Sequence, residues 1–208
     1  MIHYLSEIEK NKITVIVRTK SNVLAERVIN NSIKAGFKNV EITLTIENAY
    51  ELIKKMATKY PDVHFGAGTV LTIEDAKRSL EAGANYLVSP ILNLDLLKWT
   101  IENNVLLIPG VYSPSEIYKA TSNGAKIVKL YPSNILTPKY LKIVLNPLKN
   151  TKVLCTGGIN LDNMLEFFNA GAVAVGVSDN LGQPNENVSD DEIYQLAKNY
   201  LNKLELLK

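Results

Sequence analysis

The sequence is poor in the side chains that build disulfides and histidine metal sites. Its 208 residues include one cysteine, Cys155, and two histidines. A single cysteine excludes an intramolecular disulfide and favours a reducing compartment, so we expect a cytoplasmic protein. The two histidines, His3 and His64, do not supply an imidazole-rich metal site.

Long apolar runs and an excess charge of one sign are also missing. No apolar run is long enough to cross a bilayer, and the first twelve residues, MIHYLSEIEKNK, lack the apolar core of a signal peptide. The formal net charge of +2 creates no strong field for nucleic acid, and the tyrosines form no stacking stripe. We therefore expect neither a membrane nor a nucleic acid as a partner.

What the chain does contain is a regular alternation of short β-rich apolar runs and helical patterns. The runs are Ile13–Val17, Val40–Leu44, Val63–Ala67, Tyr86–Val88, Val105–Ile108, Ile127–Leu130, Val153–Cys155 and Ala172–Gly176. The helical patterns are Val23–Ala35, Ile46–Lys59, Ile73–Ala82, Leu94–Asn103, Pro114–Ser122, Lys139–Leu148, Asp162–Asn169 and Asp191–Leu207. Several helices end in a glycine just before the next strand, as in KAGF, EAGA, SNGA and NAGA, and glycine suits a left-handed helix terminus.

Eight strands alternating with helices predict an α/β fold, a single-domain (β/α)8 TIM barrel over residues 1–208 with a short N-terminal helix. A doubly wound open sheet is the alternative. Such a sheet usually has a glycine-rich turn after its first strand. Here the first strand is followed by residues 18–22, RTKSN, which contain no glycine.

The most informative segment is Lys126–Pro132, KIVKLYP, which places Lys129 inside a short apolar run typical of a buried strand. Burial disfavours the ammonium form, and a neutral lysine is a nucleophile toward carbonyl groups. The alternative is that Lys129 lies at the strand end and reaches water along its aliphatic stem. The segment by itself leaves both interpretations open.

Side-chain alternation indicates which residues face the barrel interior. In the second strand the polar set Glu41, Thr43 and Thr45 shares one parity, which we assign to the interior. Lys129 then projects into the same interior, with Arg18 at its rim. A structural buried ion pair between Glu41 and Lys129 is one interpretation. Paired inward charges at the top of a barrel are more often catalytic.

Glycine-rich turns follow the third and seventh strands. They are Gly66-Ala67-Gly68-Thr69 and Thr156-Gly157-Gly158. Glycine lets the backbone approach a ligand closely, and barrels often bind phosphate after the seventh strand. The alternative is that each is an ordinary turn.

Seven segments together carry a family resemblance. In order along the chain they are VIVRTKS, VEITLT, GAGTVLT, YLVSP, IPGVYSPSEI, VKLYPS and TGGIN. In these segments the chain resembles the class I 2-keto-3-deoxy-6-phosphogluconate (KDPG) and 4-hydroxy-2-oxoglutarate (KHG) aldolases, a family that includes phosphogalactonate variants. The resemblance implies a barrel, usually a homotrimer without metal or organic cofactor. It also implies carbohydrate metabolism, with reversible cleavage of a 2-keto-3-deoxy acid to pyruvate and an aldehyde.

The resemblance also implies roles for individual residues. Lys129 matches the lysine that forms a Schiff base with the C2 carbonyl, and the iminium accepts electrons when the C3–C4 bond breaks. Glu41 matches the general acid/base. The remaining matches are Thr69 and Pro90 in the pyruvate pocket and Thr156, Gly157 and Gly158 in the distal anion site.

Two positions depart from the family pattern. Where one branch has an arginine that binds the substrate carboxylate, this chain has Thr45, and we expect Arg18 to supply the charge. The alternative is a surface arginine at a strand end. After the eighth strand the family has a Gly-Ser pair for the substrate phosphate, whereas this chain has Ser178 and Asp179. Either Ser178 serves the phosphate while Asp179 caps a helical turn, or the substrate is not phosphorylated there.

Two other function classes stay open from the sequence. One is a different phosphate-binding barrel enzyme, such as a sugar-phosphate epimerase or a thiamine-phosphate-synthase-like transferase. The epimerase needs metal ligands that this chain lacks, and neither enzyme explains an inward-facing Lys129. The other is a non-catalytic oligomeric barrel, against which the presence of both Lys129 and Glu41 argues.

Overall fold

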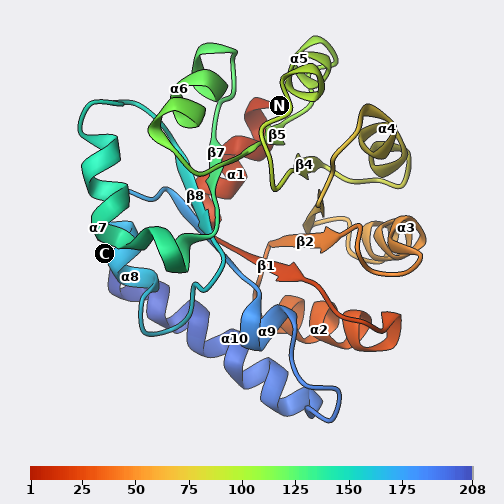
Figure 1. The fold of residues 1–208 in the computed structure, drawn as a ribbon. Coiled ribbons are helices and arrows are strands. Elements are labelled where there is room, and N and C mark those ends of the chain that lie inside the picture. Colours follow the sequence, from red (N-terminus) through yellow and green to blue (C-terminus); the bar gives the residue numbers. More distant parts are fainter. Residues whose placement is uncertain (208) are drawn as a thin grey trace.

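The computed structural model describes residues 1–207 and shows nine parallel strands in a nearly closed barrel, with helices forming an outer ring (Figure 1). The strands are β1 (Ile13–Val17), β2 (Asn39–Thr43), β3 (His64–Gly68), β4 (Tyr86–Val88), β5 (Leu107–Ile108), β6 (Gly110–Val111), β7 (Val128–Leu130), β8 (Val153–Thr156) and β9 (Ala174–Val177). The helices are α1 (Ile2–Asn11), α2 (Asn22–Ala35), α3 (Ala49–Lys59), α4 (Ile73–Glu81), α5 (Leu94–Glu102), α6 (Pro114–Ser122), α7 (Ser133–Leu145), α8 (Met164–Asn169), α9 (Asp179–Gly182) and α10 (Asp190–Leu204), followed by the 3-10 turn η1 (Glu205–Leu207). The prediction of a (β/α)8 barrel is confirmed.

The nine strands correspond to the eight predicted ones because the fifth is divided. The sheet order is β5-β4-β3-β2-β1-β9-β8-β7-β6, and β5 and β6 are separated in the chain only by Pro109. Proline has no N–H to donate to a neighbouring strand. Its carbonyl still accepts a hydrogen bond from the Lys129 N–H at 2.8 Å, so the divided strand joins β4 to β7.

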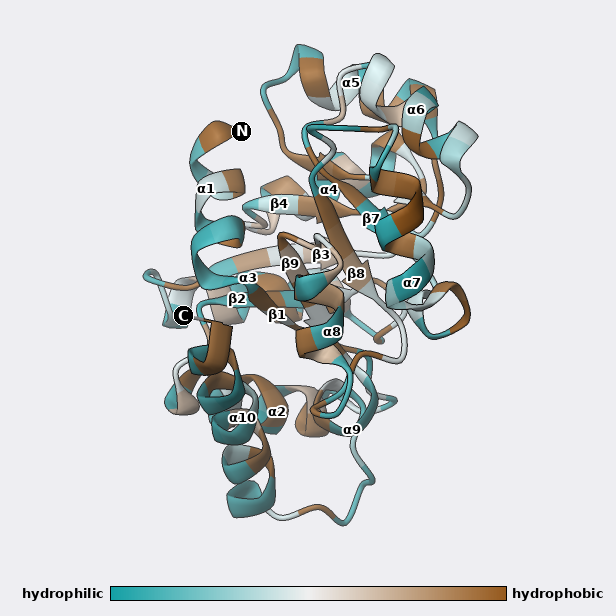
Figure 2. Ribbon diagram, turned by 90° about the vertical axis from the view of Figure 1, so that its left-hand side faces the viewer, coloured by the Kyte–Doolittle hydropathy of each residue, from teal (hydrophilic) through white to brown (hydrophobic). Residues whose placement is uncertain are grey.

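The apolar core has two layers on opposite faces of the strands. The larger layer lies between strands and helices and includes Val40 and Ile42 of β2. The smaller one fills the barrel interior, and it includes Tyr86 and Leu154. Figure 2 shows the strands as the most hydrophobic part of the ribbon. Successive side chains of a strand point to opposite faces. The layer under the helices can therefore be apolar while the barrel interior carries polar groups at the carboxyl ends of the strands.

Helix α1 closes the amino end of the barrel. Its buried residues Leu5 and Ile8 belong to the interior cluster, together with residues of β4 and β8. Figure 1 shows α1 lying across the middle of the ring of helices. The barrel is therefore accessible only from the carboxyl ends of its strands.

Local sequence explains where several helices begin. Thr72, Ser113 and Ser189 each cap a helix whose third residue is acidic, and all three form reciprocal capping boxes. The helix α7 begins six residues before the predicted Lys139 and is kinked at Thr137, which precedes Pro138 and has φ 56°. The residue before a proline is disfavoured in the α conformation, which accounts for the kink. The one-turn helix α9 agrees with the alternative in which a helical turn follows the eighth predicted strand, although Asp179 is its first residue and Ser178 stands at the N-cap.

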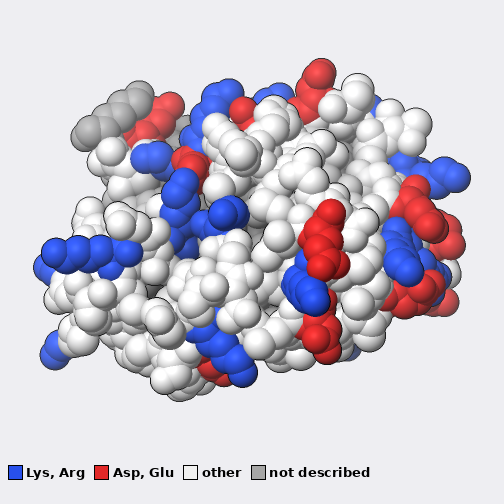
Figure 3. Space-filling model, turned by 90° about the horizontal axis from the view of Figure 1, so that it is seen from above, with Lys and Arg blue, Asp and Glu red and all other residues white. Residues whose placement is uncertain are grey.

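Charged side chains are scattered over the face of the molecule seen from above (Figure 3). On the face that Figure 3 shows, basic and acidic side chains are interspersed and separated by uncharged areas. Within residues 1–207, no helix combines the length and the hydropathy needed to span a membrane.

Candidate active site

Glu41 and Lys129 meet inside the barrel. Their strands, β2 and β7, are not neighbours in the sheet, so the two side chains meet across the interior. The Lys129 Nζ lies 3.8 Å from the Glu41 Oε1, and the two side chains are 4% and 1% exposed. The inward parity assigned to both residues from the sequence therefore agrees with the structure.

The two glycines of β3 make room for interior side chains. A Cβ added to Gly68 would lie 2.8 Å from the Glu41 Cδ, and a Cβ at Gly66 would overlap the Tyr86 ring. From the sequence, we expect these glycines to let the backbone approach a ligand. In the structure they have a further effect, because Gly68 leaves the space that the Glu41 carboxylate occupies and Gly66 leaves the space of the Tyr86 ring.

The surroundings of Lys129 favour its neutral form. Burial lowers the pKa of the Lys129 ammonium, and the nearby Arg18 charge lowers it further, whereas the Glu41 charge opposes the shift. The Nζ also lies 5.3 Å from the centre of the Tyr131 ring. A lowered pKa increases the fraction of neutral amine, which is the nucleophilic form.

Glu41 is buried without hydrogen bonds. Neither of its carboxylate oxygens has a hydrogen-bond partner among residues 1–207. Buried carboxylates in proteins are normally hydrogen-bonded, so an unpartnered one calls for an explanation. A carboxylate that exchanges protons with a ligand would be left in this state when no ligand is bound.

A cavity of about 120 Å³ opens above Lys129 at the carboxyl ends of the strands. Its lining residues come from β1, β7, β8 and α9 and from the positions that directly follow β1, β7, β8, β9 and α9. They are Ile16, Arg18, Lys129, Tyr131, Thr156, Gly157, Ser178, Asp179 and Gln183. The hydroxyl of Thr156 is buried and has no hydrogen-bond partner within the described chain, so it is available to a ligand.

Arg18 is distinguished from the other two arginines by its lack of a protein partner. Arg27 forms an ion pair with Asp190 at 2.7 Å, and the Arg78 guanidinium lies 4.1 Å from the centre of the Tyr50 ring. Among the described residues no carboxylate lies within 4 Å of the Arg18 guanidinium. Arg18 lines the cavity instead, so its charge is available for an anion.

Five of the predicted site residues do not line this cavity: Glu41, which lies buried beside Lys129, and four residues nearer the surface. Thr45 is exposed, and its hydroxyl lies 2.8 Å from that of Thr43. Thr69 is half-buried and adopts a left-handed backbone with φ 63°. Pro90 and Gly158 are half-buried beside the site. Their contacts with a substrate stay predictions.

The cavity also includes residues that sequence reasoning did not select. Tyr131 shares its parity with Lys129, so strand alternation could have identified it. Gln183 gave no such signal, because it follows the one-turn helix α9 in a stretch without strand or helix periodicity. No group of three potential metal-ligating side chains occurs within residues 1–207.

Comparisons with known proteins agree with this geometry. The family described as KDPG and KHG aldolase matches residues 5–196 of the chain. The 2-dehydro-3-deoxy-phosphogluconate aldolase of Treponema pallidum is 31% identical over 80% of this chain and 80% of its own length. The KHG/KDPG aldolase of Escherichia coli is 32% identical, over 65% of this chain and 64% of its own length. The crystal structure of the KDPG aldolase of Zymomonas mobilis superimposes with a TM-score of 0.85 at 26% identity, covering 93% of this chain and 94% of that one.

Proposed function

The chain belongs to the KDPG and KHG aldolase family, and we propose that Lys129 and Glu41 carry out the family's reaction in it. It is a lyase that cleaves a 2-keto-3-deoxy acid to pyruvate and an aldehyde. The observation that carries the assignment of residues is the buried pair, whose charged atoms lie 3.8 Å apart beneath the cavity.

In the proposed mechanism the neutral Lys129 amine attacks the C2 carbonyl of the substrate. Proton transfer to the carbonyl oxygen and loss of water give an iminium. Glu41 then accepts the proton of the C4 hydroxyl, the C3–C4 bond breaks, and its electron pair moves into the iminium to form an enamine. The aldehyde leaves, the enamine is protonated at C3, and water hydrolyses the imine to release pyruvate and the free amine.

Arg18 is proposed to bind the carboxylate of the keto acid. Its guanidinium has no ion-pair partner in the described chain and lines the cavity that contains Lys129. A planar guanidinium can donate two parallel hydrogen bonds to a carboxylate, which would fix the C2 carbonyl relative to the amine. Thr45, Thr69 and Pro90 are proposed to border the pyruvyl end.

The opposite end of the substrate is proposed to lie against the ends of β8 and β9. Four residues are assigned to it: Thr156, Gly157, Gly158 and Ser178. The unpartnered Thr156 hydroxyl supports this placement, because it lines the same cavity as Lys129.

We also propose a homotrimer that acts in cytoplasmic carbohydrate metabolism, with residues 1–208 forming one domain. Large apolar side chains exposed on α7 support self-association, since Ile135 and Ile143 are 65% and 57% exposed. The only cysteine, Cys155, is buried in β8, which fits a reducing compartment. Light scattering after size-exclusion chromatography would test the trimer.

The activity is tested by coupling pyruvate release to lactate dehydrogenase. A panel of KDPG, KHG and unphosphorylated 2-keto-3-deoxygluconate covers the substrate class. Release of pyruvate from at least one of them is expected. No release from any of the three, from a protein that is folded by circular dichroism, would contradict the proposed function.

A further inference from the structure

One wall of the cavity is formed by the segment that follows β9. Ser178 and Asp179, at the start of α9, and Gln183, directly after it, line this wall. Asp179 and Gln183 are both exposed to solvent at the mouth of the cavity. They introduce a carboxylate and an amide into a cavity whose other ionisable lining residues are the basic Arg18 and Lys129.

This wall is fixed rigidly to the end of β1. The Arg18 N–H donates to the Gly182 carbonyl at 3.0 Å, and a Cβ at Gly182 would overlap the Ile16 carbonyl. The Gln183 N–H donates to the carbonyls of Ser178 and Asp179 at 2.9 and 3.2 Å. The backbone that carries Asp179 and Gln183 is thereby held against the end of β1, and both residues line the cavity.

The charges in the cavity are distributed unevenly. Its two basic lining residues, Arg18 and Lys129, are both assigned to the pyruvyl end in the proposed function. The remaining lining residues include no further cation but do include the Asp179 carboxylate. A carboxylate repels a phosphate dianion, whereas a carboxylate and an amide together accept from and donate to hydroxyl groups.

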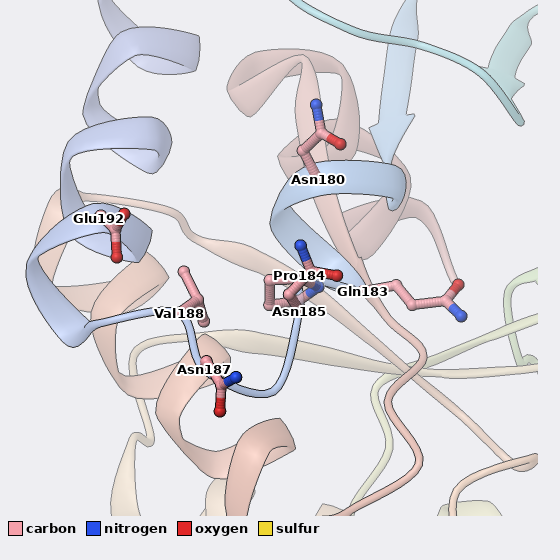
Figure 4. A pocket seen from close by; sticks show the side chains of 7 residues that line it. All are labelled: Asn180, Gln183, Pro184, Asn185, Asn187, Val188 and Glu192. Atoms are coloured by element: carbon pink, nitrogen blue, oxygen red, sulfur yellow. The ribbon is translucent and has the colours of Figure 1, made fainter.

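Polar surroundings without an excess of positive charge continue beyond Gln183. This residue also borders two adjoining hollows of about 410 and 310 Å³. The larger is lined by the amides of Asn180, Asn185 and Asn187 and by the Glu192 carboxylate, and it contains no basic side chain. The smaller contains one basic side chain, Lys20, and one carboxylate, Glu186. Figure 4 shows the Gln183 side chain extending away from Glu192 and α10.

We propose that the substrate of this enzyme is an unphosphorylated 2-keto-3-deoxy sugar acid, whose hydroxyl-bearing end is recognised by Asp179 and Gln183. This inference rests on the proposed function. The Asp179 carboxylate accepts hydrogen bonds from the hydroxyls, and the Gln183 amide both donates and accepts. A site built to hydrogen-bond hydroxyls discriminates strongly against a ligand that leaves its polar groups unpaired.

The test is the ratio of kcat/KM for 2-keto-3-deoxygluconate to that for its 6-phosphate, measured by coupled pyruvate release. We expect a ratio of about ten or more in the unmodified protein, because the phosphate must approach Asp179. Asp179→Ser should lower the ratio at least about tenfold by removing the repulsion. Asp179→Asn should shift it in the same direction, and Gln183→Ala should reduce turnover of the unphosphorylated acid. Asp162→Asn is the matched control, since this exposed carboxylate follows β8 but lines neither the cavity nor the two adjoining hollows.

A ratio below one in the unmodified protein, or an unchanged ratio in both Asp179 variants, would overturn the proposal. Cleavage of KHG with neither sugar acid turned over would also overturn it. A separate measurement distinguishes these failures from failure of the proposed function. Borohydride trapping of pyruvate needs only the pyruvyl end of the site, so an adduct on Lys129 would show that the chemistry stands while the recognition of hydroxyls does not.

Discussion

The two ends of the barrel treat their polar groups differently. At the amino end, around the plug formed by Leu5 and Ile8, the Glu7 carboxylate lies 3.5 Å from the His64 imidazole, and Asn85 bonds both the Tyr4 hydroxyl and the Phe65 N–H. Within the described chain, the buried polar atom without a partner there is the uncharged Oδ1 of Asn39. At the carboxyl end the Glu41 oxygens and the Thr156 hydroxyl are buried without partners. Buried polar groups without partners lower the free energy of unfolding, and hydrogen bonds to a bound substrate can compensate for this loss at the carboxyl end.

The comparison predicts that changes at the carboxyl end remove activity while changes at the amino end remove stability.

The largest effect is expected for Lys129→Arg, which should abolish pyruvate release. Arginine keeps a positive charge beside Glu41 but cannot form the imine. Substantial turnover in this variant, measured by the coupled assay, would show that another group performs the chemistry.

The next largest effect is expected for Glu41→Gln, which preserves shape and removes the proton acceptor. We expect kcat to fall by about two to four orders of magnitude, the range typical of a positioned acid/base. Steady-state kinetics and urea unfolding should be measured on the same preparation. Near-normal kcat combined with a loss of stability would instead identify a structural ion pair.

A smaller effect is expected for Arg18→Ala. Loss of a charged hydrogen bond to the carboxylate should raise KM by about one to two orders of magnitude. Arg18→Lys should recover part of the loss, because a point charge cannot reproduce the planar two-bond geometry. The double variant Arg18→Ala with Thr45→Arg should restore some activity, because it returns a guanidinium from the end of the strand next to β1, at the position where one branch of the family has its arginine.

An unchanged KM in Arg18→Ala would make Arg18 a rim residue. The matched control is Arg27→Ala, which removes an arginine paired with Asp190 outside the cavity. Its KM should stay at the unmodified value.

The smallest effect on catalysis, with a large effect on stability, is expected for Ile8→Ala. Ile8 is 1% exposed in the plug at the amino end, and truncating such a side chain costs about 2–5 kcal/mol of unfolding free energy. Urea unfolding should detect this loss, while kcat of the folded protein should not change. A fall in kcat without a loss of stability would mean that the two ends are coupled.

The sequence was sufficient for the barrel and for the Glu41–Lys129 pair because both follow from short-range periodicity. Alternation in Val40–Leu44 and in Ile127–Leu130 determines which residues face inward, and a closed sheet then brings the inward charges together. Arg18 could be proposed as a cavity residue by the same parity. Parity could not reveal that Arg18 has no ion-pair partner among the described residues, because this depends on where the carboxylates lie in the folded chain.

Other features depend on contacts that periodicity does not encode. The division of the fifth strand at Pro109 depends on how β4 and β7 approach it. The placement of Gln183 depends on Gly182 packing against the Ile16 carbonyl, an approach between segments far apart in the chain. Likewise, Gly68 must lack a side chain because the Glu41 side chain of the neighbouring strand occupies that space. The GAGT motif alone does not reveal this contact.

The central claim is that Lys129 forms the imine, and the most direct measurement is reductive trapping. The protein is incubated with pyruvate, reduced with borohydride and digested, and the modified lysine is identified by peptide mass. We predict one adduct, on Lys129, which persists in Lys126→Arg, a matched change in the same segment, and disappears in Lys129→Arg. An adduct on another lysine, or no adduct at all, would contradict the mechanism.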